Sequence, residues 1–403
     1  MIHQLARGTH DAISSYMGSE RELVLDQDDL TLRLMDGTTP GGTVISDQVV
    51  IQGPTEVTVG NTVTYVIVNY NVFSEYSVAA VDGTVSIDEA VITYTPETTE
   101  SNFRVTCDGV TRRIIPEIKT LGLDGIYTEV SGGATGRYGH STATIGSKMY
   151  MFGGYDNNGY QNDLWSYDPQ TDAWQQLSSG ATPRRYHTAV AIGSKMYMFG
   201  GYVSNGYLND LWCYDPQTDG WQQLTSGATE RFGHSAVAIN DLMYVFGGYN
   251  GSNWLNDLWS YDPQTDVWQQ LTSGATPRIS HSAVAIDGRM FVFGGSDGDG
   301  RVNDLWMYNP QTDAWQQLSP GATERNNHAA VAVGGRMYVF GGGGGDGRLN
   351  DLWSYGPQTD EWQQLASGAT ARNVHAAVAI DGKMYVFGGF DGSSRLNDLW
   401  VIS

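Results

Sequence analysis

The strongest constraint on this chain is a motif that recurs six times, every 47 residues, from about Gly133 to the C-terminus. Its clearest mark is a glycine doublet at Gly153-Gly154, Gly200-Gly201, Gly247-Gly248, Gly294-Gly295, Gly341-Gly342 and Gly388-Gly389. Repeats of about 40 to 50 residues, with short apolar runs between Gly-rich turns, are typical of β-propellers in which each repeat forms one four-stranded blade. The sequence therefore predicts an all-β fold with a six-bladed propeller.

Each copy divides into four segments of strand length. In the second copy these are HTAVAI, KMYMFGG, DLWCYD and GWQQL, which are rich in β-branched and aromatic residues and bounded by Gly, Asn, Asp or Pro. The copies resemble the kelch family, whose repeats carry a Gly-Gly doublet and then a Tyr and a Trp at fixed spacing, here Gly200-Gly201, Tyr214 and Trp221. The resemblance implies a six-bladed kelch propeller over residues 125–403.

The last copy stops at Ser403, after its third strand. Upstream of the first copy, in IYTEVSG, Tyr127 falls in the column of the repeated Trp and Val130 in the column of Leu177. We therefore expect an N-terminal strand at about residues 126–132 to complete the last blade and remove an exposed sheet edge.

The first 124 residues contain none of the 12 Trp and lack the 47-residue repeat, which indicates separate units. Residues 45–122 carry alternating apolar runs between turn-forming residues and resemble bacterial immunoglobulin-like modules, so we expect a small Ig-like β-sandwich spacer there. Residues 1–44 resemble the N-terminal module of phage tail-fibre proteins of the major tropism determinant type. The matching features are RGT at 7–9, a short helix, the segment 22–26, Thr31-Leu32 and the turn DGTTPGG at 36–42. This resemblance implies a virion component that is attached through residues 1–44.

Charge and composition exclude some functions. The chain has 44 acidic and 22 basic residues, a net charge of -22, which argues against nucleic acid as a partner. No apolar run is long enough to span a bilayer, and the start has no signal-peptide core, so we expect no membrane insertion and synthesis in the bacterial host cytoplasm. Cys107 and Cys213 lie in different segments, which predicts no structural disulfide.

Columns that never change among the six copies indicate scaffold. They include an arginine at Arg137, Arg184, Arg231, Arg278, Arg325 and Arg372, and a histidine at His140, His187, His234, His281, His328 and His375. A ring of imidazoles near a central channel is one way to bind a metal. We favour a structural role, because a closed ring spreads these side chains too widely for one ion, and we expect no metal and no cofactor.

Two positions in the repeat vary, the pair after the arginine and the loop after Gly-Gly. In a four-stranded meander these two connections emerge at the same end, so both sets share one face of the propeller. The candidate ligand-binding residues are Tyr138, Arg185, Tyr186, Phe232, Asn326, Asn327 and Asn373 from the first position, and Tyr155, Tyr160, Tyr202, Tyr207, Tyr249, Trp254, Asp297, Asp299, Arg301, Arg348, Phe390 and Arg395 from the second.

The candidates are mainly aromatic in copies one to three, whereas Arg and Asp dominate copies four to six. Exposed aromatic rings beside Asn, Asp and Arg suit a sugar, which stacks its C–H face on a ring and bonds its hydroxyls to polar groups, and they suit a protein partner almost as well. The alternative is that the loops vary without selection for binding.

An enzymatic function has little support. The six repeats have only three glutamates, and Glu230 and Glu324 share a variable column, which allows a glycosidase-like pair. Sialidase-type Asp boxes are missing, so we expect no enzyme. A calcium site at Asp297, Asp299 and Asn303 lacks the EF-hand glycine and terminal glutamate.

These features predict a phage tail or tail-fibre protein, located in the virion, whose propeller binds a host surface glycan or outer-membrane protein. Residues 1–44 would bind other virion tail proteins, and a homotrimer would strengthen weak binding through avidity. Two alternatives stay open: a tail subunit whose propeller only packs in the particle, and a cellular kelch protein-interaction module.

Overall fold

The computed structural model describes residues 123–403 in full and, before them, only the backbone of strands β1 to β13. The chain divides into two compact units, Met1–Leu121 and Gly122–Ser403. Every regular element among the described residues is a β-strand, as the sequence predicts. In this same part of the chain, no helix is long and apolar enough to cross a membrane.

The first unit contains several small sheets. One sheet has the order β1-β2-β3-β4, with β1 parallel to β2, and the other strands form sheets of the order β5-β7-β10-β9, β12-β11-β8 and β13-β6. The bounds are Ala6–Gly8, Glu22–Asp26, Leu32–Met35, Thr43–Val44, Ile51–Gln52, Glu56–Thr58, Val63–Ile67, Tyr76–Ala80, Thr84–Asp88, Val91–Thr95, Phe103–Cys107, Val110–Ile114 and Glu117–Lys119 for β1 to β13 in order. The expected helix lies outside the described residues, and the tail-fibre-like module and the Ig-like sandwich stay predictions.

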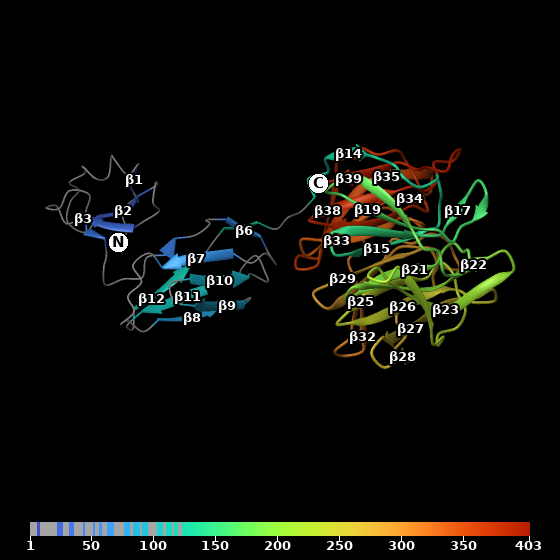
Figure 1. The fold of residues 1–403 in the computed structure, drawn as a ribbon, viewed down its shortest axis with the longest axis horizontal. Helices are drawn as coiled ribbons and strands as arrows, with labels where there is room; N and C mark the ends of the chain where they lie inside the picture. Colours follow the sequence, from blue (N-terminus) through green and yellow to red (C-terminus); the bar gives the residue numbers. More distant parts are fainter. Residues whose placement is uncertain are drawn as a thin grey trace. The chain divides into compact units, whose positions relative to one another are not determined.

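The second unit is a six-bladed propeller of four-stranded antiparallel sheets (Figure 1). Blade 1 has β15 (Ser141–Ile145), β16 (Lys148–Phe152), β19 (Leu164–Asp168) and β20 (Ala173–Leu177), with the small hairpin β17 (Tyr155–Asp156) and β18 (Gly159–Tyr160). Blade 2 has β21 (Thr188–Ile192), β22 (Lys195–Val203), β23 (Gly206–Asp215) and β24 (Gly220–Leu224). Blade 3 has β25 (Ser235–Ile239), β26 (Leu242–Tyr249), β27 (Trp254–Asp262) and β28 (Val267–Leu271).

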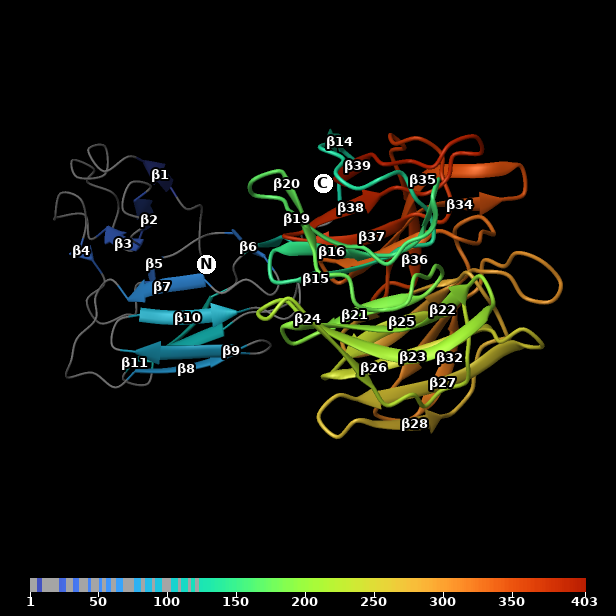
Figure 2. The same cartoon turned by 45° about the vertical axis from the view of Figure 1, so that its right-hand side comes forward.

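The remaining blades repeat this order. Blade 4 has β29 (Ser282–Ile286), β30 (Arg289–Phe293), β31 (Leu305–Asn309) and β32 (Ala314–Leu318). Blade 5 has β33 (Ala329–Val333), β34 (Arg336–Gly344), β35 (Gly347–Gly356) and β36 (Glu361–Leu365). Blade 6 has β37 (Ala376–Ile380), β38 (Lys383–Phe387) and β39 (Leu399–Ile402), and its fourth strand is β14 (Tyr127–Val130). In both views the first strands, such as β21 and β25, lie toward the middle of the propeller and fourth strands such as β28 lie at its edge (Figures 1 and 2).

The two ends of the propeller segment meet in blade 6. Strand β14 pairs antiparallel with β39, with Tyr127 opposite Ile402 and Val130 opposite Leu399, and Figure 1 shows the two strands side by side at the C-terminus. The Tyr127 hydroxyl donates a hydrogen bond of 3.0 Å to the Ala366 carbonyl of blade 5. The strand that the sequence predicts at about 126–132 therefore lies at Tyr127–Val130 and closes the ring.

The hydrophobic core lies between blades rather than inside them. One cluster combines Phe246 and Leu258 of blade 3 with Met290, Val292 and Tyr308 of blade 4, all almost fully buried. Equivalent clusters occupy the other seams. A single copy cannot bury its apolar faces alone, which explains why the copies fold as a closed ring.

The invariant arginine holds each blade together at the end where Gly-Gly lies. Arg231 is fully buried, and its guanidinium donates to both carboxylate oxygens of Asp257 at 2.7 and 2.8 Å and to the Gly247 carbonyl at 3.0 Å. Its other donors bind the carbonyl and hydroxyl of Thr229. Every hydrogen of the guanidinium is used, which confirms the scaffold role predicted for this column.

The kelch Tyr and Trp connect each blade to its neighbour. Tyr214 donates to Asp219 at 2.7 Å, and Asp219 in turn accepts from the Ser178 hydroxyl of blade 1 at 2.8 Å. Trp221 donates to the Ser178 carbonyl at 2.8 Å. The repeated turn therefore links each blade to its neighbour by hydrogen bonds.

Candidate ligand-binding face

The two variable positions of the repeat meet on one face. In blade 1 the backbone N–H of Tyr155 donates to the Tyr138 carbonyl at 2.9 Å, and the N–H of Tyr138 donates back at 3.2 Å. The same antiparallel bridge joins the equivalent residues in each of the other five blades. The loop after Gly-Gly is thus hydrogen-bonded to the segment that leads into the first strand of its own blade. The residues of both variable positions therefore form one surface.

The glycine doublet is what allows this close approach. A Cβ on Gly200 would lie 2.9 Å from the Arg231 carbonyl oxygen, and one on Gly201 would lie 2.9 Å from the Cβ of His187. Both glycines have positive φ, 65° and 110°. A side chain at the first glycine would push against the neighbouring blade, and one at the second would push the loop away from its own blade, so the doublet allows the close packing of this face.

Ten aromatic residues form a continuous belt over blades 6, 1, 2 and 3. Each ring centroid lies within 6.4 Å of a neighbour, the usual range for interacting aromatic pairs. The aromatic belt consists of Phe390, Tyr138, Tyr155, Tyr160, Tyr186, Tyr202, Tyr207, Phe232, Tyr249 and Trp254. All ten side chains are half-buried rather than fully exposed, because they pack on one another.

Arg185 is inserted into the belt. Its guanidinium carbon lies 5.1 to 5.6 Å from the ring centroids of Tyr138, Tyr155, Tyr160, Tyr186 and Tyr202. One of its terminal nitrogens donates to the Tyr138 hydroxyl at 2.7 Å. Five aromatic rings around one cation hold this part of the surface in a defined arrangement.

The arginines of blades 5 and 6 lie over the following blade. Arg348 covers the ring of Phe390 in blade 6 at 4.8 Å, and Arg395 lies 5.6 and 5.3 Å from the rings of Tyr138 and Tyr155 in blade 1. The sequence suggests an aromatic half and a charged half of the face. In the structure the side chains reach across seams, so the arginines of blades 5 and 6 join the aromatic belt.

The other candidates lie on the polar part of the face, over blades 4 to 6. The Asn326 amide donates to the Ser296 hydroxyl at 2.8 Å, while Asp299 and Arg301 are exposed. Asp297 caps its own loop by accepting the N–H groups of Asp299 and Gly300 at 3.0 and 3.1 Å. Asn373 pairs through its backbone with Phe390, and its buried side-chain oxygen has no partner among the described residues.

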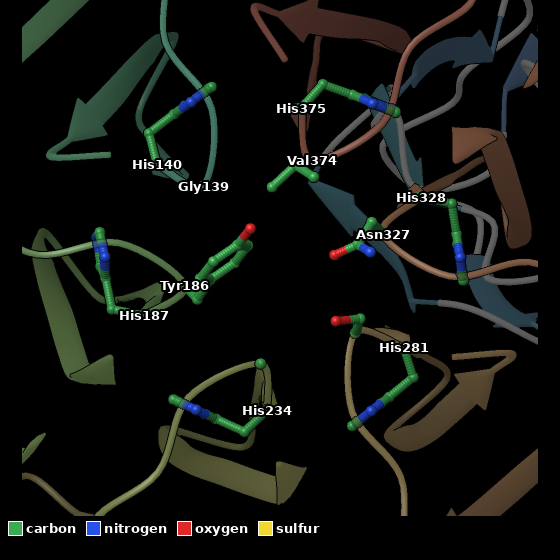
Figure 3. Close-up of a pocket in the computed structure, with 12 residues that line it drawn as sticks. Gly139, His140, Tyr186, His187, His234, His281, Asn327, His328, Val374 and His375 are labelled. Carbon is green, nitrogen blue, oxygen red and sulfur yellow. The ribbon is translucent and has the colours of Figure 1, made fainter. Parts of the chain in front are cut away.

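A ring of backbone hydrogen bonds closes the mouth of the central channel on this face. One residue per blade donates its N–H to the carbonyl of the equivalent residue in the preceding blade, at 2.7 to 3.1 Å, and the first residue donates to the last. This collar consists of Gly139, Tyr186, Gly233, Ser280, Asn327 and Val374. All six have φ between 52° and 67°. Figure 3 shows the side chains of Tyr186, Asn327 and Val374 directed into the middle of the ring.

The sequence did not reveal the collar. The sequence predicts Tyr186 and Asn327 as variable binding residues, whereas the feature that the six copies share at this position is a left-handed backbone conformation. The available signal was glycine at Gly139 and Gly233 in this column, with an asparagine at Asn327, since these residues tolerate positive φ best.

The six histidines surround the collar, as Figure 3 shows. All are buried, and burial together with the nearby scaffold guanidinium lowers the pKa of His140 and His234 to about 3. Thr188 lies 2.9 Å from Nε2 of His234 and shares a hydrogen bond with it, and Ser235 pairs in the same way with His281 at 2.8 Å. The histidines are therefore uncharged, and their buried side chains pack between neighbouring blades.

The described residues contain no group of three or more His, Cys, Asp or Glu side chains that could hold a metal ion. Asn303, the third member of the calcium candidate, donates to the Ala322 carbonyl at 3.2 Å. Glu230 and Glu324 are both exposed. Behind the collar, the inner strands enclose a channel of about 280 Å³ lined by alanine, valine and Thr144.

The geometry of the blades agrees with the comparison to known families. The family described as "KLHDC2/KLHL20/DRC7 Kelch-repeats domain" matches residues 127–272, 228–323 and 322–403, about two thirds of the chain. The chain belongs to the kelch-repeat family. Kelch propellers are typically interaction modules without enzymatic activity. A search of the curated proteins gave no match to the chain.

Proposed function

We propose that this kelch protein is a phage tail or tail-fibre component whose propeller binds the host cell surface through the aromatic belt. The observation that supports binding most directly is the belt itself. Ten interacting aromatic rings on the face that carries nearly all the variation between copies form a rigid, amphipathic platform. Such residues dominate binding energy at recognition surfaces.

The virion context rests on residues 1–44, whose motif resembles tail-fibre attachment modules. The net charge of -22 would repel nucleic acid and would favour solubility. Attachment through residues 1–44 and a recognition face on the propeller would suit a protein displayed on a particle. We expect contacts to other tail proteins through residues 1–44, and a homotrimer would multiply weak contacts of single propellers.

The test is binding of the full-length protein to cells and extracted surface glycans of candidate bacteria. We compare it with a Tyr207→Ala, Trp254→Ala double variant, since Tyr207 stacks on Phe232 at an interplanar angle of 15° and Trp254 ends the belt. The control is Val267→Ala, an apolar side chain that is 56% exposed on the outer strand β28. We expect the double variant, still folded, to lose at least about tenfold in affinity, and the control to bind normally.

A second candidate is a cellular protein-interaction module, which the match to a kelch-repeats domain favours. In that case the same belt would bind a peptide or protein and not whole bacteria. A tail subunit whose belt is buried against its neighbours is a third candidate. Mass spectrometry of purified particles, combined with labelling of the belt tyrosines in intact particles, separates these cases.

A further inference from the structure

We propose that the pair Arg185 and Arg395 is the anion-binding centre of the face, and that it takes a carboxylate-bearing sugar of a surface polysaccharide. This inference rests on the proposed function and names the ligand class of the same face. It starts from two cations that converge on blade 1 from the blades on either side.

Both guanidiniums contact the same pair of rings. The Arg185 carbon lies 5.6 and 5.2 Å from the centroids of Tyr138 and Tyr155, and the Arg395 carbon lies 5.6 and 5.3 Å from them. Side chains of blades 1, 2 and 6 therefore meet around the same two rings. Both arginine residues are half-buried.

Within residues 123–403, neither arginine has a carboxylate partner. Each scaffold arginine forms an ion pair with an aspartate, but none of the ion pairs among the described residues includes Arg185 or Arg395. Arg185 donates to the Tyr138 hydroxyl and Arg395 to the Asn157 amide oxygen at 2.8 Å, both neutral acceptors. Their Nε atoms are buried without a partner.

The chain has 44 acidic and 22 basic residues, and neither of these two guanidiniums forms an ion pair with a described carboxylate. A guanidinium binds a carboxylate through two parallel hydrogen bonds, and such charge-assisted pairs are roughly twice as strong as neutral ones. The missing partner is therefore best supplied by the ligand.

The surrounding groups favour a sugar over an acidic peptide. Among the described residues, the hydroxyls of Tyr155, Tyr160, Tyr186 and Tyr202 have no protein hydrogen-bond partner. All four rings surround the Arg185 guanidinium carbon at 5.1 to 5.5 Å, and the ring of Tyr155 also lies 5.3 Å from that of Arg395. A saccharide offers many hydroxyls and a C–H face in one rigid unit, whereas an acidic peptide offers few hydroxyls.

The first test measures binding of the full-length protein to three probes by calorimetry. The probes are uronic-acid oligosaccharides of glucuronate, galacturonate and mannuronate, their carboxyl-reduced forms, and an oligoglutamate of equal charge. We expect a uronate to bind and its reduced form to bind at least about tenfold more weakly, since a charged hydrogen bond is lost. Equal binding of the reduced form, tighter binding of oligoglutamate, or no binding of any uronate overturns the proposal.

The second test uses Arg185→Gln and Arg395→Gln, with Arg289→Gln as the control because Arg289 is exposed at the start of β30, at the opposite end of the blade. Each of the first two should weaken uronate binding at least about tenfold, and Arg185→Lys should recover only part of the loss. Thermal unfolding checks that all variants fold. If the wild type binds cells and both Gln variants bind them equally well, this inference is wrong but the proposed function stands. If the wild type binds no cells, the proposed function is wrong.

Discussion

Val374 is the residue in the collar least suited to its backbone conformation. It is β-branched and has φ of 57°, a region in which such side chains are rare. Two other blades have a glycine at the same position, Gly139 and Gly233. The six copies therefore provide an internal comparison of how well each residue fits one site.

We predict that Val374→Gly stabilises the protein by about 0.5 to 1 kcal/mol, because the strain of a left-handed residue exceeds the entropy lost by glycine. Gly233→Ala is the reverse experiment and should destabilise by about 1 kcal/mol, since its new Cβ would have no contact shorter than 3.5 Å and only φ opposes it. Urea unfolding measures both. Destabilisation by Val374→Gly would mean that packing of the valine outweighs its backbone strain.

At the level of elements, blade 6 differs from the others because two distant segments form it. Strand β14 contributes four residues and the Tyr127 ring, which packs near Phe340 and Trp400 at 6.1 and 6.4 Å. Without β14, the hydrogen-bonding edge of β39 would be exposed. Such an edge promotes association with other chains.

Two truncations test this closure. A chain that starts at Gly122 keeps β14, and we expect it to unfold at nearly the same temperature as the propeller in the full chain. A chain that starts at Gly132 lacks β14 and should lose about 3 kcal/mol or more, comparable with removing a large buried aromatic side chain, and should associate at high concentration. Equal stability of the two truncations in calorimetry and light scattering would show that blade 6 does not need its fourth strand.

The elements were largely predictable from the sequence, and the contacts between them were not. The repeat determined the strands, and Tyr127 in the Trp column located the closing strand, because strand patterns depend on local side-chain order. The contact of Arg395 with Asn157 spans 238 positions in the sequence and forms only when the ring closes. The collar is made of backbone groups, so it leaves no side-chain pattern beyond tolerance of positive φ.

At the scale of the whole molecule, the six buried histidines couple stability to pH. Their pKa values are lowered by burial and by the scaffold arginines, to about 3 for His140 and His234. In the unfolded chain each histidine titrates near pH 6.5. Between these values the unfolded chain binds more protons, so stability is fully present above pH 6.5 and is lost as the pH falls toward 3.

We predict that the free energy of unfolding decreases steeply below pH 6.5, since each histidine contributes about 1.4 kcal/mol per pH unit well below its unfolded pKa. The pKa of Asp257 is lowered, because its ion pair with Arg231 outweighs the opposing effect of burial, so this carboxylate adds acid sensitivity only below about pH 4. Urea unfolding from pH 7.5 to 5 measures the slope, and His375→Gln should remove about one sixth of it. A flat profile over this range would show that the histidines are not held neutral in the fold.

The collar also bears on how such a gene can change. Nearly identical repeats favour unequal recombination, which adds or deletes whole copies. A gained or lost copy changes the angle between neighbouring blades and so alters the geometry of all six collar bonds together, whereas a substitution in one loop alters one seam. The ring therefore leaves the loop sequences free to vary while it constrains the number of copies.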